Sequence, residues 1–215
     1  MGSTESKIPL QCAVFSNDDL HMEDLLYEQV KTEFEELILA DRPVIVGIDG
    51  RCGSGKTSFA EMLRKHFPCN VLHMDDFYLP FRKRQPDWME IPGGNMDFER
   101  LRRELLLPLR AGEQAYYHAY VCPEDKLMEP VKLTGHKLTV VEGSYSHHPS
   151  MQEDYDLRIF LTCSPDVQRS RLKKREGSKF SGFEEKWIPM EERYFQRFDI
   201  EANSHLVINT DEYFR

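Results

Sequence analysis

The chain has 215 residues, of which 40% are hydrophobic and 30% charged, and its formal net charge is -9 at pH 7. This length and balance predict one domain with a sizeable buried core. The acidic balance argues against a nucleic-acid polymer as partner, because binding along a phosphate backbone needs a broad basic face. No apolar run approaches the roughly 20 residues that a membrane-spanning helix requires, so we expect no membrane partner.

The five cysteines are odd in number and scattered, without a C-x-x-C pair. This pattern argues against both a disulfide framework and a zinc site. We therefore expect a protein of the reducing cytoplasm. The sequence permits a homo-oligomer without specifying one.

The first predicted element is an N-terminal helical extension over residues 1–42. Ser16–Asp19 can cap a helix, the apolar residues between Leu25 and Ile38 share one broad face, and Arg42-Pro43 ends it.

Short, continuously apolar runs then alternate with helical stretches, which predicts an α/β fold with a parallel sheet and right-handed crossovers. The predicted strands are Val44–Ile48, Val71–Met74, Leu138–Val141, Leu157–Leu161 and Leu206–Ile208. The predicted helices are Thr57–His66, Asp97–Leu109, Pro165–Arg175 and Pro189–Phe198.

Two segments interrupt this alternation. Residues 115–134 predict an antiparallel β excursion in which Tyr116–Val121 and Val131–Thr134 are strands and Pro123–Asp125 is the turn. Gly177–Gly182, with its glycines and serines, predicts a mobile loop. The adjacent His147 and His148, beside Pro149, are interpreted as solvated loop residues because no third metal ligand is nearby in the sequence.

The segment Gly50–Thr57 fits the pattern G-x-x-x-x-G-K-[ST], directly after a predicted strand and at the start of a predicted helix. Such a loop turns successive backbone N–H groups inward as a nest for phosphates, and the helix adds its positive N-terminal end. Lys56 would reach the β- and γ-phosphates, and the Thr57 hydroxyl would bind Mg²⁺. The predicted nucleotide-binding residues are Gly50, Gly53, Ser54, Gly55, Lys56, Thr57 and Ser58.

Further charged residues follow the other predicted strands. Asp75 and Asp76 come at the end of the second strand, where carboxylates border the ligand crevice of an open α/β sheet, and Glu142 ends the third. Arg171 and Arg175, four residues apart, share one helix face and could neutralise a migrating phosphoryl group.

These segments together resemble the phosphoribulokinase/uridine kinase family, from about Val44 to Asn209. The similarity is carried by the phosphate loop, Asp75-Asp76-Phe77-Tyr78, Glu142-Gly143 and Arg171–Glu176. It implies a single P-loop kinase domain over residues 1–215, a three-layer P-loop NTPase fold with a five-stranded parallel sheet, and a lid over residues 177–186. By position, the resemblance implies the following roles: Asp75 as catalytic base, Lys56, Arg171 and Arg175 as catalytic cations, Thr57 and Glu142 at the magnesium ion, and Tyr78 stacking on the acceptor's base.

The chain also departs from that family. Asp76 stands where close uridine kinases have serine, an arrangement more similar to nicotinamide riboside kinases. The Phe-Asp-His-Pro stretch that helps hold ribose is absent, which leaves Asp97 or Asp87 as candidates for that role. Asp76, Tyr78, Asp97 and Tyr120 are therefore the predicted acceptor-binding residues.

The sequence thus predicts an ATP- and Mg²⁺-dependent kinase that phosphorylates a hydroxyl of a small acceptor, with a nucleoside such as uridine as the first candidate. Nicotinamide riboside, pantothenate or a sugar derivative are alternatives for the same fold, and ATP is not separated from GTP by the pattern. A regulatory P-loop module is the other rival, opposed by the absence of an Asn-Lys-x-Asp segment and by the base-like Asp75.

Overall fold

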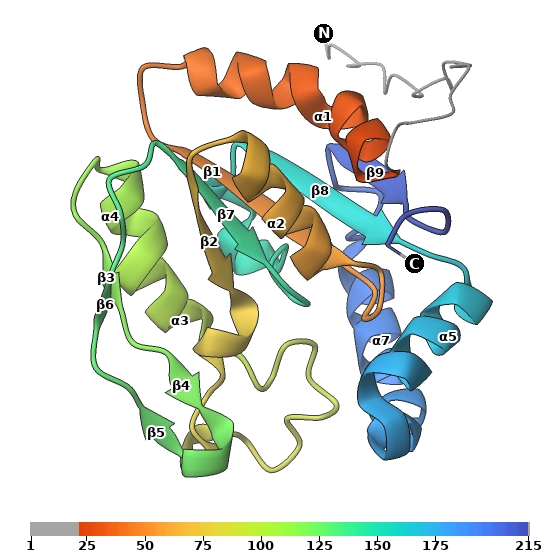
Figure 1. Ribbon diagram of the computed structural model, residues 1–215. Helices are drawn as coiled ribbons and strands as arrows, with labels where there is room; N and C mark the ends of the chain where they lie inside the picture. Colours follow the sequence, from red (N-terminus) through yellow and green to blue (C-terminus); the bar gives the residue numbers. More distant parts are fainter. Residues whose placement is uncertain (1–21, 215) are drawn as a thin grey trace, which may run out of the picture.

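The computed structural model describes residues 22–214 (Figure 1). The predicted capping residues Ser16–Asp19 lie outside this range. The N-terminal helix α1 covers Met22–Leu39, and its fully buried side chains recur about one turn apart at Leu26, Val30 and Phe34. Within residues 22–214, every helix falls short of the length or the apolar content that a bilayer span demands.

Five parallel strands form the central sheet in the order β2-β7-β1-β8-β9. Their bounds are β1 Val44–Gly50, β2 Cys69–His73, β7 Leu138–Glu142, β8 Leu157–Thr162 and β9 Leu206–Asn209. The prediction of a five-stranded parallel sheet is confirmed. Because the strands run parallel, the segments that follow β1, β7 and β2 all leave the sheet at the same edge. Ligands bind at this edge in open α/β folds.

Each face of the sheet carries its own hydrophobic core, because alternate residues of a strand point to opposite faces. In β1, Ile45 belongs to one core, whereas Val44 and Val46 belong to the other. Helices α1 and α2 (Lys56–His66) cover the second core. The first core is covered by α7 (Ile188–Phe198) and by a helical run of α3 (Phe98–Leu101), a π-helical turn and α4 (Leu107–Arg110). The predicted three-layer α/β fold is thus confirmed.

The β excursion is present but differs in detail from the expected single hairpin. β3 (Tyr116–Tyr117) pairs with β6 (Val131–Lys132), and β4 (Tyr120–Val121) pairs with β5 (Lys126–Leu127), both antiparallel. A 3₁₀ turn at Cys122–Glu124, followed by Asp125 with φ 46°, closes the inner pair.

The prediction of a mobile loop at Gly177–Gly182 is wrong, because this segment is helical. Helix α5 (Pro165–Glu176) ends at Gly177, and a 3₁₀ turn, α6 (Phe180–Gly182) and a π-helical turn (Phe183–Trp187) lead directly into α7. The glycines therefore interrupt a helical connection rather than form an open loop (Figure 1).

Candidate active site

The phosphate loop leaves β1 at Gly50 and enters α2 at Lys56. Its backbone requires glycine, because Gly50 has φ 140° and an added Cβ there would lie 2.0 Å from the Leu161 carbonyl oxygen. Gly53 and Gly55 also adopt positive φ, 78° and 92°. These conformations are accessible to glycine and strained for other residues, so the sequence dictates the curled loop.

Lys56 bends back over this loop, and its Nζ donates to the carbonyls of Gly50 at 2.7 Å and Arg51 at 3.1 Å. Ser54 Oγ is buried and has no hydrogen-bond partner among residues 22–214. A curled, glycine-rich backbone with an orphaned hydroxyl and a lysine at its centre fits the phosphates of a nucleotide. Thr57 and Ser58 are exposed in the first turn of α2, at the positive end of the helix.

Glu142 ends β7 directly beside β1, where it pairs in register with Ile48. Its carboxylate is buried, with 4% of the residue exposed, and its Oε1 accepts a hydrogen bond from the Thr57 hydroxyl at 3.1 Å. A hydroxyl and a carboxylate are the protein ligands that Mg²⁺ commonly uses alongside substrate phosphates and water. The structure thus brings together the two residues predicted to bind magnesium, although residues 22–214 contain no cluster of three or more His, Cys, Asp or Glu side chains suited to a metal ion.

His73 was not singled out by sequence reasoning, yet its Nδ1 lies 2.6 Å from Glu142 Oε1. The two residues are opposite each other in the register of β2 and β7. The hydrogen bond to Glu142 raises the pKa of His73, against the opposing effect of burial. Only the order of the strands reveals this neighbour.

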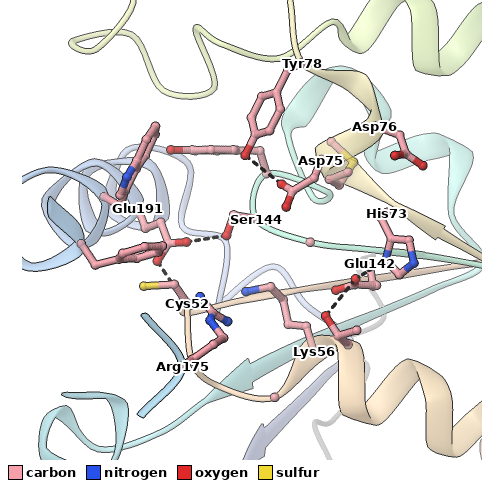
Figure 2. A pocket seen from close by; sticks show the side chains of 18 of the residues that line it. Cys52, Lys56, His73, Asp75, Asp76, Tyr78, Glu142, Ser144, Arg175 and Glu191 are labelled. Atoms are coloured by element: carbon pink, nitrogen blue, oxygen red, sulfur yellow. Dashed lines mark hydrogen bonds and ion pairs between the residues drawn. The ribbon is translucent and has the colours of Figure 1, made fainter. Parts of the chain in front are cut away.

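Asp75 and Asp76 both line the same cavity as the phosphate loop. They do not continue strand β2, which ends at His73, but sit in a 3₁₀ turn over Met74–Phe77. In Figure 2 the two carboxylates point in different directions, with Asp75 toward Tyr78 and Asp76 toward the side of His73. Asp75 Oδ1 accepts the Tyr78 hydroxyl at 2.8 Å, whereas burial raises the pKa of Asp76.

Of the two predicted catalytic arginines, one lines the cavity and the other does not. Arg175 lines the cavity, where it pairs with Glu176 at 2.7 Å and lies over the Phe183 ring. Arg171 is not among the lining residues, and its guanidinium donates to the hydroxyl and carbonyl of Thr210 at 3.0 and 2.6 Å and to the Tyr213 carbonyl. Arg171 also donates to the Gly53 carbonyl at 3.3 Å, so it ties α5 to the segment after β9 and to the back of the phosphate loop, outside the cavity, and we do not retain it as a catalytic residue.

Two predicted acceptor-binding residues also lie outside the cavity lining. Asp97 caps α3 by accepting the Arg100 N–H at 3.1 Å, and its other oxygen faces the Arg100 guanidinium. Tyr120 is buried and donates its hydroxyl to Asp125. The candidate Asp87 is exposed and does not line the cavity either. Asn95 takes their place at the cavity, where its buried Oδ1 has no partner among the described residues.

The histidine pair is not solvated as predicted. His147 is 1% exposed, its Nε2 lies 3.0 Å from the Gly47 carbonyl, and burial lowers its pKa to about 3. His148 is half-buried and stacks on Phe98 at 4.1 Å, and burial lowers its pKa to about 4. These histidines support the fold, because Gly47 leaves room for the imidazole of His147 against β1.

The cavity itself has a volume of about 890 Å³, within the range of small-molecule sites. Besides the residues above, it is lined by Cys52, Ser144, Tyr145, Phe183, Trp187 and Glu191. Tyr145 has φ 75°, a left-handed conformation that is rare outside glycine and clusters at functional sites. Figure 2 shows Lys56 between the wall that carries Glu142 and the wall that carries Glu191.

Comparison with known proteins agrees with this geometry. Residues 46–188 match the AAA domain family. A uridine kinase of Saccharomyces cerevisiae is 28% identical over 167 residues, which are 67% of this chain and 32% of the relative. Human nicotinamide riboside kinase 1 is 46% identical over 44 residues, 20% of this chain and 22% of the relative. The chain thus spans about a third of the yeast protein's length and less of the human one.

Among solved structures, one described as a "possible uridine kinase" from Bacillus stearothermophilus superposes with a TM-score of 0.64. It is 21% identical, and the superposition covers 86% of this chain and 99% of that one. At this identity the likeness shows the shared fold. The family match over residues 46–188 shows that the chain belongs to the AAA domain family.

Proposed function

We propose that this protein is a kinase that uses ATP and Mg²⁺ to phosphorylate a hydroxyl group of a small acceptor. One observation carries the proposal: Lys56, the Thr57–Glu142 pair and Asp75 all face one cavity next to a phosphate loop. A nucleotide-binding module without transfer chemistry has no need of a carboxylate at the position of Asp75.

The phosphate-binding end of the cavity would work mainly by positioning and charge neutralisation. The loop amides and Lys56 would hold the β- and γ-phosphates, with Lys56 exchanging its two loop carbonyls for phosphate oxygens. Thr57 and Glu142 would hold Mg²⁺, which when bound neutralises charge on the phosphates. Arg175, from the other side of the cavity, would stabilise the charge of the moving phosphoryl group.

At the acceptor end, Asp75 would take the proton of the attacking hydroxyl as general base. The Tyr78 hydroxyl, bonded to Asp75 at 2.8 Å, would hold that carboxylate in its orientation. The proposed lid, residues 177–186, contains Phe183, and Trp187 follows it directly. Both rings line the cavity and would exclude water when the lid closes.

For the acceptor we propose a nucleoside, with uridine as the first to test. Support comes from the uridine kinase relative and from the aromatic Tyr78 beside Asp75. A second candidate, nicotinamide riboside, is favoured by Asp76 in the lining and by the 46% identical segment shared with the human kinase of that name. The cysteines of residues 22–214 are all free, which supports a cytoplasmic site of action.

A panel assay for ADP release would test the proposal. Purified protein would receive ATP and Mg²⁺ with uridine, cytidine, nicotinamide riboside, pantothenate or a sugar, and each reaction would be repeated with chelator. We expect turnover that depends on one acceptor and on the metal. Slow ADP release that ignores every acceptor would favour a regulatory module instead.

A further inference from the structure

Glu191 is a buried acid, 5% exposed, that lies on the first turn of α7 and lines the cavity. The roles proposed above do not use it. Its Oε2 accepts a hydrogen bond from the backbone N–H of Cys52 at 2.9 Å, and its Oε1 accepts one from the Ser144 hydroxyl. Figure 2 shows the carboxylate between these two groups. Glu191 therefore connects the lid-side helix, the phosphate loop and the turn that follows Glu142.

Cys52 is the third residue of the phosphate loop, so its amide belongs to the set of inward N–H groups that form an anion nest. In this structure that amide already has an anionic partner within the protein. The terminal phosphate of a nucleotide would carry a second negative charge to the same donor, and two like charges at contact distance in a closed cavity repel strongly. The carboxylate and the phosphate thus compete for one site.

The contact is also held from both sides. Ser144 sits in a turn whose next residue, Tyr145, has the left-handed φ of 75°, so the hydroxyl is presented to Glu191 by a strained backbone. On the other side, Tyr194, one turn along α7, is fully buried and donates its hydroxyl to Asp49 at 2.8 Å. This anchor fixes the helix just after Glu191, whereas the preceding residues 183–189 are half-buried or exposed.

We propose that Glu191 is an internal anion that occupies the phosphate loop in the absence of nucleotide and is displaced by the γ-phosphate. The inference rests on the proposed function, since it requires that the loop binds ATP. The amides further along the loop and at the start of α2 would hold the β-phosphate, so ADP would leave the Glu191–Cys52 contact intact. Displacement would free the junction between the lid segment and α7 only when a transferable phosphate is present.

The test compares ATP and ADP binding by calorimetry, with Mg²⁺, for the unaltered chain, Glu191→Gln and Glu113→Gln. In Glu191→Gln the amide side chain would keep an oxygen for the Cys52 N–H but lose the charge. Glu113 is exposed in the turn after α4 and is absent from the cavity lining, so its substitution makes the same change in net charge away from the site. We expect Glu191→Gln to tighten ATP binding about three- to tenfold and to change ADP binding less than about twofold. Glu113→Gln should change neither.

A second readout follows the amide itself. In the unaltered protein, ATP but not ADP should shift the amide NMR resonance of Cys52. Ser144→Ala removes one of the two hydrogen bonds to the Glu191 carboxylate, so it should also tighten ATP binding, but less than Glu191→Gln does. Equal ATP affinity in the unaltered chain and Glu191→Gln, or weaker binding in folded Glu191→Gln, would overturn the inference alone. No ATP binding by the unaltered chain would overturn the proposed function and this inference with it.

Discussion

The indole rings of Trp88 and Trp187 lie with their centroids 6.3 Å apart and their planes tilted by 39°. Trp187 lines the cavity from the π-helical turn before α7, and Trp88 belongs to the connection between β2 and α3. A second link joins α7 to the same connection, because the Arg193 guanidinium donates to the Met89 carbonyl at 2.8 Å. The cavity-lining turn before α7 and the connection between β2 and α3 therefore touch through an aromatic pair.

This pair should report closure of the lid. The chain has two tryptophans, both at this contact, so intrinsic fluorescence is specific for it. We expect ATP together with an acceptor to change the emission and to slow hydrogen exchange over residues 177–187. Trp88→Phe should keep a signal from Trp187. Unchanged exchange with both ligands bound would contradict a lid.

Lys56→Ala should abolish turnover while leaving the fold intact. Lys56 contacts only loop carbonyls through its Nζ in the described structure, so its removal deletes a charge for the phosphates without opening the core. Steady-state kinetics and thermal unfolding of the purified variant would measure both effects. Activity within a few-fold of the unaltered protein would contradict the central role of the phosphate loop.

Asp75→Asn should lower kcat by roughly 10² or more with little change in ATP affinity, which is the usual size of a general-base contribution. Asparagine keeps the size of the side chain and can still accept the Tyr78 hydroxyl, but it cannot take a proton. Asp76→Asn is the matched control, since it removes a neighbouring carboxylate of the same cavity. Its effect should fall on the acceptor KM or on magnesium dependence. A dead Asp76→Asn beside an active Asp75→Asn would move the base to Asp76.

The features that could be predicted from the sequence are those set by local pattern. Alternating apolar runs and helices gave the sheet, and the glycine spacing gave the loop, because both depend on residues close together in the chain. Glu142 was found because it ends an apolar strand, and the order of strands then places it beside Thr57.

The parts that could not be predicted depend on distant neighbours. Arg171 and Arg175 share a helix face and look equivalent in sequence, but the carbonyls of Thr210 and Tyr213, after the last strand, bind Arg171. His147 has polar neighbours in sequence and is buried because the fold packs its ring against Gly47 and Ser204, which are distant in the chain. Glu191 belongs to no motif, and an acid on an amphipathic helix is expected to be solvated. Only the fold shows that it accepts a hydrogen bond from the Cys52 N–H.

These contacts predict different phenotypes for the two arginines. Arg171→Ala should lower the free energy of unfolding by about 2 kcal/mol, because several charged hydrogen bonds are lost, with kcat within a few-fold. Arg175→Ala should lower kcat about tenfold or more and leave stability nearly unchanged, since the Arg175 side chain is 57% exposed. Urea denaturation and steady-state kinetics on both variants would check this. A stable but inactive Arg171→Ala would restore its predicted catalytic role.

Asp156 should make the stability of the fold depend on pH in the acid range. Its side chain is 8% exposed and accepts hydrogen bonds from Ile45 N–H at 2.8 Å, Arg42 at 2.7 Å and Arg110 at 2.9 Å. Burial by itself would raise the pKa of Asp156, but these hydrogen bonds together hold it below its ordinary value. A carboxylate whose pKa is lower in the folded state stabilises the fold at all pH values above its unfolded pKa of about 3.9, and this contribution disappears as the pH falls through the folded pKa.

We therefore expect Asp156→Asn to lower the free energy of unfolding by about 1–3 kcal/mol near neutral pH and by progressively less below about pH 4. Urea denaturation of both proteins at several pH values would measure the difference, with Asp166→Asn, an exposed acid in the first turn of α5, as the control. A difference that stays constant down to about pH 2 would show that the loss comes from geometry and not from the charge.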